Sequence, residues 1–309
     1  MYLGLDFLLS DKKEIFLSEV NIGLPGGAFE YDIAHKAVFS RKVDVFEKIE
    51  EISQRNFRKS FRDYIHSLPF RKELKEFKFF MDREITTPLK LHPVLRLEDK
   101  WIQYNLLSKK IGMPYTELFD FSDKEQIERL LSRFGAVALK KRTGRWGKGF
   151  EVLKDRKLSG AMIDIPYLAQ EYVTSKTDNY LLSIRTVSFE GEFVCMSGDL
   201  SESHDSKWRY IVFIKAGEKV LLENKNFEII DFEEMSWEGK IWYDGKIPEH
   251  QRLNLVGDKV AKTFLLLPND IIEGIKKITE DVGKIYMNLD FSELPEAWFE
   301  QKIKGKNKK

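Results

Sequence analysis

The chain has little of what marks several common classes of protein. Its single cysteine, Cys195, in 309 residues excludes an intrachain disulfide framework and a cysteine-rich zinc site. Its 19 glycines and 9 prolines are too few for a collagen-like or low-complexity chain, and 42% apolar residues are too many for a disordered one. Lys and Arg number 51 against 50 Asp and Glu, so the formal net charge of +1 argues against nucleic acid as a partner bound through bulk charge.

Long apolar runs are missing as well. No run approaches the length of about 18 apolar residues that a membrane span needs, and no charged segment precedes an apolar stretch at the N-terminus. We therefore expect no secretory signal and no membrane partner, and a soluble protein of a reducing compartment, the cytoplasm. The length predicts two domains or one large one.

The first part of the chain alternates apolar and other residues on both sides of a polar turn at 10–13. This pattern predicts a β-hairpin that begins at residue 2 or 3. The hairpin carries Asp6 in its first strand, and Glu19 and Asn21 share one face of its second because they are two residues apart.

Residues 44–83 are predicted to be mostly helical, with a break at Pro69. An apolar stripe that includes Phe57, Phe61 and Ile65 is expected to pack inward, which leaves a basic face between Arg55 and Arg62 in solvent. Contact of that face with nucleic acid is the alternative. Further on, the patterns predict helices at 99–111, 122–134 (opened by a capping box at Ser122 and Glu125) and 271–282, a hairpin around Glu190-Gly191, and strands at 136–140, 150–153, 167–173 and 285–291.

The strongest chemical signal is a lysine- and glycine-rich segment between two predicted strands. A strand delivers Lys140, and Gly144, Gly147, Lys148 and Gly149 follow it. Glycines let backbone N–H groups close around phosphate oxygens, and lysines neutralise phosphate charge. The spacing is neither a Walker A loop nor a dinucleotide fingerprint, because a strand follows the glycines. Alone, the segment fits an ordinary hairpin with exposed lysines equally well.

Other motifs stand in order on either side of this segment: Asp99-Lys100, Gly112-Met-Pro-Tyr-Thr116, Gln170-Glu171-Tyr-Val173 and a strand arginine, Arg185. The series resembles the ATP-grasp superfamily in content and order over 99–200, and piecewise at the two chain ends. The resemblance implies an α+β fold in which two lobes hold ATP between them.

One motif of the resemblance stands at the wrong end of the chain. ATP-grasp chains usually carry Glu-x-Asn near the C-terminus, whereas here Glu19-Val-Asn21 lies near the N-terminus. The resemblance therefore implies a circularly permuted ATP-grasp fold with an extra helical segment. Its expected parts are a metal-site hairpin of the C-terminal lobe (1–32), the helical segment (33–98), a small lobe (99–173) and a large lobe (174–309). A hairpin swapped into a second subunit, in a homodimer, is the rival arrangement.

The resemblance also implies a role for each motif. Lys100, Lys140 and the loop with Gly144, Gly147, Lys148 and Gly149 would hold the ATP phosphates, and Gln170, Glu171 and Val173 would face the adenine. Arg185 would stabilise the transferring phosphoryl group, with Arg209 in place of a second arginine of the family. Asp6, Glu19 and Asn21 would bind Mg²⁺ or Mn²⁺, and Asp290 competes with Asp6 for this role.

The implied activity is an ATP-dependent ligation of a carboxylate to an amine through an acyl phosphate. The substrates would be small molecules or peptides. Two alternatives stay open. One is phosphoryl transfer without ligation, and the other is a non-enzymatic module that binds nucleotide or nucleic acid through the basic helix and the lysine-rich tail.

Overall fold

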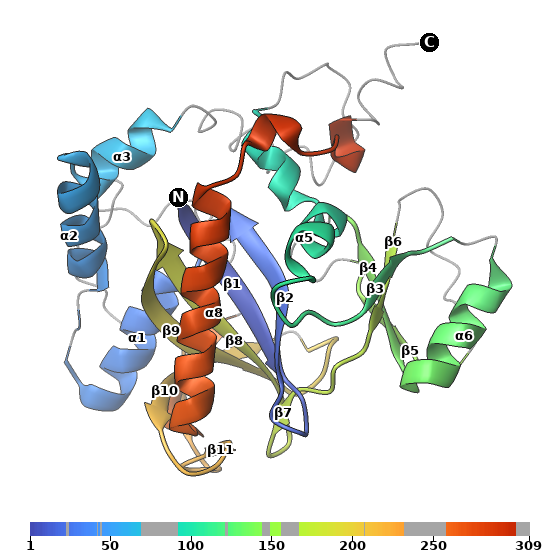
Figure 1. Cartoon of the computed structure of the whole chain (residues 1–309). Coiled ribbons are helices and arrows are strands. Elements are labelled where there is room, and N and C mark those ends of the chain that lie inside the picture. Colours follow the sequence, from blue (N-terminus) through green and yellow to red (C-terminus); the bar gives the residue numbers. More distant parts are fainter. Residues whose placement is uncertain are drawn as a thin grey trace. The chain divides into compact units, whose positions relative to one another are not determined.

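The computed structural model describes residues 1–22, 25–41, 43, 45–68, 92–120, 123–143, 149–155, 167–206, 208–231 and 258–300. These residues form a mixed α+β structure with two compact units (Figure 1). Unit 1 comprises Met1–Leu68 and Thr174–Leu289, and unit 2 comprises Pro69–Val173 and Asp290–Lys309. Among the helices described, none combines the length and the apolar character needed to cross a membrane.

Unit 1 is built on a sheet in which nine strands are described. The order along the sheet is β11-β13-β10-β9-β8-β1-β2, while β12 pairs with β13 and β7 with β8. Neighbours on this path are antiparallel except β10 and β13, which are parallel. The strands are β1 (Tyr2–Leu9), β2 (Ile15–Ile22), β7 (Lys176–Thr177), β8 (Tyr180–Phe189), β9 (Glu192–Ser201), β10 (Arg209–Ala216), β11 (Leu221–Leu222), β12 (Glu228–Asp231) and β13 (Asp258–Leu267).

The N-terminal hairpin is confirmed, and it is part of this sheet. Strand β1 lies between β2 and β8, so it is hydrogen-bonded on both sides. Its alternating residues Leu3, Leu5 and Phe7 are completely buried. They share a face with Thr186, whose hydroxyl lies 2.9 Å from that of Thr279 in helix α8 (Asn269–Met287). Helix α8 therefore covers this face of the sheet (Figure 1).

Three helices pack on the opposite face: α1 (Ala28–Phe39), α2 (Val45–Phe57) and α3 (Phe61–Ser67). The inward packing of the aromatic stripe is confirmed. Phe61 is buried with its ring centroid 5.0 Å from that of Phe189, and Ile65 belongs to the same core cluster. Helix formation over 69–83 lies outside the described residues.

Unit 2 contains a sheet of four described strands in the order β3-β6-β4-β5. These are β3 (Thr116–Leu118), β4 (Val137–Lys141), β5 (Glu151–Leu153) and β6 (Tyr167–Glu171). Helix α6 (Lys124–Phe134) packs on one face through a cluster that includes Ile127, Leu130 and Leu139. The unit also contains α5 (Lys100–Leu107) and two 3₁₀ helices, η1 (Pro93–Glu98) and η3 (Phe291–Glu293).

Two sequence predictions about secondary structure are wrong. The strand predicted at 285–291 does not form: helix α8 continues to Met287, and the 3₁₀ helix η3 begins at Phe291. Val282 and Tyr286 extend the buried stripe of the helix at a spacing of four residues, and this periodicity outweighs the likeness of 286–291 to the first strand. The cap of α6 is Asp123, which accepts from the N–H groups of Glu125 and Gln126, and not Ser122, which lies outside the described residues.

Candidate functional site

The register of the central strands of unit 1 brings four predicted site residues to one face of the sheet. Asp6 lies opposite Glu19 on β2 and opposite Arg185 on β8. The Arg185 Nε donates to Asp6 Oδ1 at 2.7 Å, and its Nη2 donates to Oδ2 at 3.0 Å. Asn21 Nδ2 donates to the same Oδ2 at 3.2 Å. Residues that are 179 positions apart in the chain thus form a two-pronged ion pair.

Charged residues also lie on the next two strands of the sheet. Asp199 lies on β9, and its Oδ2 is 3.8 Å from Arg209 Nη1 on β10. Burial alone would lower the pKa of Arg185, but the carboxylates of Asp6, Asp199 and Glu30 outweigh it and raise that pKa well above its ordinary value. Arg185 therefore keeps its positive charge at neutral pH.

The first turn of α1 begins against the stem of this arginine. Gly27 has φ +125°, and a Cβ there would lie 2.8 Å from Val187 Cγ2 and 3.3 Å from Arg185 Cδ. Only glycine fits both this conformation and this space. The Gly27 N–H donates to the Glu30 carboxylate, so this backbone donor is already satisfied within the chain.

In unit 2, Lys140 lies on the face of the small sheet opposite α6. Its neighbour Leu139 belongs to the core cluster under α6, and consecutive strand residues point to opposite faces. The Lys140 ammonium is 5.9 Å from the centre of the Phe150 ring. Gly149 has φ +74°, a conformation that favours glycine, and a Cβ there would meet Tyr167 Oη at 2.9 Å and the flexible end of Lys141. Gly144, Gly147 and Lys148 lie outside the described residues.

The predicted adenine hinge holds strands β3 and β6 together. Gln170 Nε2 donates to Thr116 Oγ1 at 2.8 Å, and Glu171 Oε2 accepts from the N–H of Tyr115 at 3.2 Å. Gln170 and Glu171 are consecutive strand residues, so their side chains point to opposite faces of β6. The two side chains therefore do not both face one adenine, as the prediction expected. Val173 is buried just beyond the end of β6.

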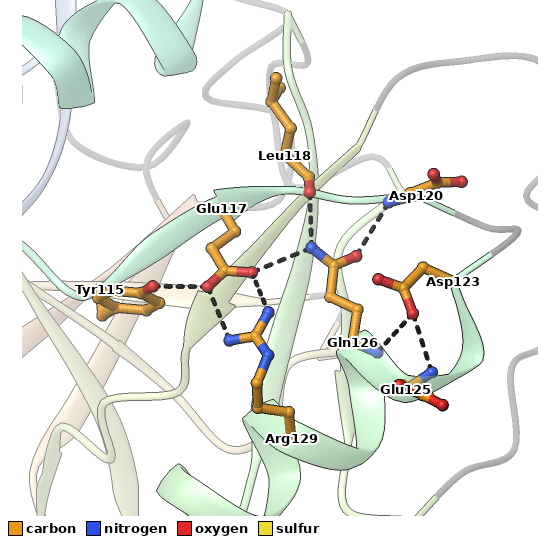
Figure 2. A network of polar contacts seen from close by, with 8 residues as sticks. All are labelled: Tyr115, Glu117, Leu118, Asp120, Asp123, Glu125, Gln126 and Arg129. Atoms are coloured by element: carbon orange, nitrogen blue, oxygen red, sulfur yellow. Dashed lines mark hydrogen bonds and ion pairs between the residues drawn. The ribbon is translucent and has the colours of Figure 1, made fainter.

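A second network fixes β3 to α6 (Figure 2). Arg129 donates to both oxygens of Glu117 at 2.9 and 2.7 Å, and Tyr115 Oη donates to the same carboxylate. Gln126 bridges Glu117 and the Leu118 carbonyl. The bond with Arg129, with help from Tyr115 and Gln126, lowers the pKa of Glu117 to about 2. This network positions the strand that pairs with the hinge.

Asp99 makes more contacts than the sequence indicated. The side chain is 0% exposed, and Oδ1 accepts from the N–H of Trp101 at 3.0 Å and from Arg142 Nε at 2.8 Å. Oδ2 accepts from the N–H of Trp298 at 3.0 Å. The N–H of Lys100 donates to the Arg142 carbonyl at 2.9 Å. Asp99 therefore joins the start of α5, the residue that follows β4 and the C-terminal segment, whereas the sequence pattern placed it only at the start of a predicted helix.

Two of the four predicted metal ligands, Asp6 and Asp290, are bonded to other groups of the chain. Both oxygens of Asp6 accept from Arg185. Asp290 belongs to unit 2, where Oδ1 caps η3 by accepting from the Ser292 N–H at 2.9 Å and its hydroxyl at 2.6 Å. Within the described parts of the chain, no three His, Cys, Asp or Glu side chains are grouped to hold a metal.

Comparison with known proteins gives little further information. No protein-family model matches the chain, and no curated protein matches it. Among solved structures, the chain is similar to a candidate gamma-glutamylcysteine synthetase from Methylobacillus flagellatus KT, with 10% identity over 65% of this chain and 75% of that one. The TM-score is 0.34, which is too low to transfer a fold or an activity.

Proposed function

We propose that the chain is an ATP-dependent ligase that joins a carboxylate to an amine, and that it is a circularly permuted member of the ATP-grasp superfamily. One observation carries the proposal. The N-terminal hairpin pairs with β8, so that Asp6 and Asn21 lie beside Arg185 although the sequence separates them by most of its length. In a circularly permuted chain, a hairpin moved to the N-terminus has to pair with the same strand as before, and the pairing of β1 with β8 supports this proposal.

The proposal assigns nucleotide binding to unit 2 and phosphoryl transfer to unit 1. In unit 2, Lys140 lies on a sheet face opposite the helix, where its ammonium can bind phosphate oxygens. The proposed nucleotide ligands are Lys100, Lys140, Gly144, Gly147, Lys148, Gly149, Gln170, Glu171 and Val173. The ion that accompanies the phosphates would arrive with the nucleotide as Mg·ATP, because both oxygens of Asp6 already accept from Arg185.

The chemistry has two steps. A carboxylate oxygen of the first substrate attacks the γ-phosphorus, the bond to the β–γ bridging oxygen breaks, and ADP leaves. The amine of the second substrate attacks the acyl phosphate, inorganic phosphate leaves, and the nitrogen loses a proton. The guanidinium of Arg185, with Arg209 beyond it, stabilises the negative charge on the phosphoryl group, while the chain supplies position and electrostatics.

Calorimetric titration with ATP tests the nucleotide assignment. Lys140→Ala should weaken ATP binding roughly 10- to 100-fold, because a charged donor to phosphate contributes about 1.5–3 kcal/mol. Its thermal midpoint should match that of the parent chain. Lys154→Ala, at an exposed lysine just beyond β5, is the matched control and should bind ATP normally. Unchanged affinity in Lys140→Ala, or no binding by the parent chain, would refute the assignment.

A further inference from the structure

Arg185 is oriented from two sides. The fork formed by Nε and Nη2 is fixed by both oxygens of Asp6, its direct partner across β1 and β8. The aliphatic stem lies against Gly27, where α1 begins. Strand register and helix packing set these contacts, so the guanidinium has one defined orientation and is no chance surface pair.

Among the described residues, the guanidinium of Arg185 has no hydrogen-bond partner besides Asp6, so its other edge is unpaired there. Its side chain is 22% exposed, so part of it is within reach of solvent. Such a fixed planar edge binds an oxyanion, either phosphoryl or carboxylate, through two parallel hydrogen bonds.

We propose that Asp6 is a positioning residue that aims Arg185 at an oxyanion of the substrate, and that it is not a ligand for a metal ion. A divalent cation at Asp6 would compete with Arg185 for the same two oxygens and would break two charge-assisted hydrogen bonds. Asn21 strengthens the arrangement, because its amide donates to Asp6 Oδ2. The inference rests on the proposed function, since it concerns how that site binds phosphate.

The two roles of Asp6 predict different results when magnesium is removed. ATP binding to Asp6→Asn and to the parent chain should be measured with Mg²⁺ and again with EDTA. A positioning role weakens both forms of ATP by the same factor, roughly 10- to 100-fold for a lost charge-assisted contact. A metal-ligand role weakens only Mg·ATP, and that result would overturn the proposal. Asp199→Asn removes a nearby charge that makes no hydrogen bond to Arg185, and should have the smaller effect.

A spectroscopic readout separates this proposal from the proposed function. In the full chain labelled with ¹⁵N-arginine, the Nε–H of Arg185, assigned by its loss in Arg185→Lys, should be protected from exchange. Tripolyphosphate should shift it without any metal, whether or not ATP is turned over. Manganese ion alone should leave it sharp, and selective broadening would place a metal at Asp6 and overturn the inference. If Asp6→Asn does not fold, these measurements on the parent chain decide the question.

Discussion

Replacing Asp99 should separate two contributions to the stability of unit 2. Asp99→Ala removes the cap of α5, which costs about 1 kcal/mol, since its carboxylate accepts from the N–H of Trp101. It also leaves Arg142, only 13% exposed, without its partner, and breaking a buried ion pair costs about 3 kcal/mol or more. The expected total is about 4 kcal/mol, a large part of the roughly 5–15 kcal/mol that stabilises a typical domain. Asp99→Asn keeps a capping oxygen, so it should cost about 3 kcal/mol.

Urea unfolding followed by circular dichroism and tryptophan fluorescence measures these differences. Trp101 and Trp298 both donate backbone N–H groups to Asp99, so fluorescence reports on this part of the chain. An Arg142→Leu background provides the control, because removing Asp99 should cost much less once no unpaired cation is left. A loss of less than about 1 kcal/mol in Asp99→Ala would refute the reasoning about the buried pair. Equal losses in both backgrounds would refute the assignment of the cost to Arg142.

Two further changes test the packing and the electrostatics. Gly27→Ala should destabilise the chain by about 1–3 kcal/mol more than Gly135→Ala, because both glycines have positive φ but only a Cβ at residue 27 meets other atoms. Equal losses of unfolding free energy in urea would contradict the predicted clash. The pKa of Glu117 is lowered to about 2, so its ion pair with Arg129 adds stability above pH 4.5 that disappears as the pH falls toward 2. In Glu117→Gln the temperature of the thermal unfolding midpoint should therefore change less with pH between those two values. If its dependence on pH matches that of the parent chain, Glu117 does not control the loss of stability.

Local features of the fold were predictable because neighbouring residues determine them. The alternation in residues 2–9 and 15–22 predicted the hairpin. A second hairpin was predicted around Glu190-Gly191, and these two residues form the turn between β8 and β9. Their φ values of 51° and 74° are those that such a two-residue turn requires. The stripe around Phe61 likewise predicted which side of the helical segment is buried. The strand predicted at 285–291 was wrong because a short motif likeness was given more weight than a longer helical periodicity.

The main contacts of the candidate site could not be read from local pattern. The partners Asp6 and Arg185 are 179 residues apart, and Asp99 and Trp298 are 199 apart. Such contacts depend on the order of strands in a sheet and on where the chain returns, which no short window of sequence specifies. The prediction grouped Asp6 with Glu19 and Asn21 as metal ligands, whereas the register of β1 and β8 gives Asp6 an arginine partner.

The most direct test of ligase activity is trapping of the acyl phosphate with hydroxylamine. The full chain should be incubated with Mg·ATP, a panel of amino acids and small dicarboxylates, and hydroxylamine, while ADP and hydroxamate are measured together. A ligase gives hydroxamate and ADP in equal amounts with at least one carboxylate, and Arg185→Met, which removes the guanidinium, should abolish both. ADP release without hydroxamate, or no ATP-dependent product from any carboxylate, would contradict the proposed function.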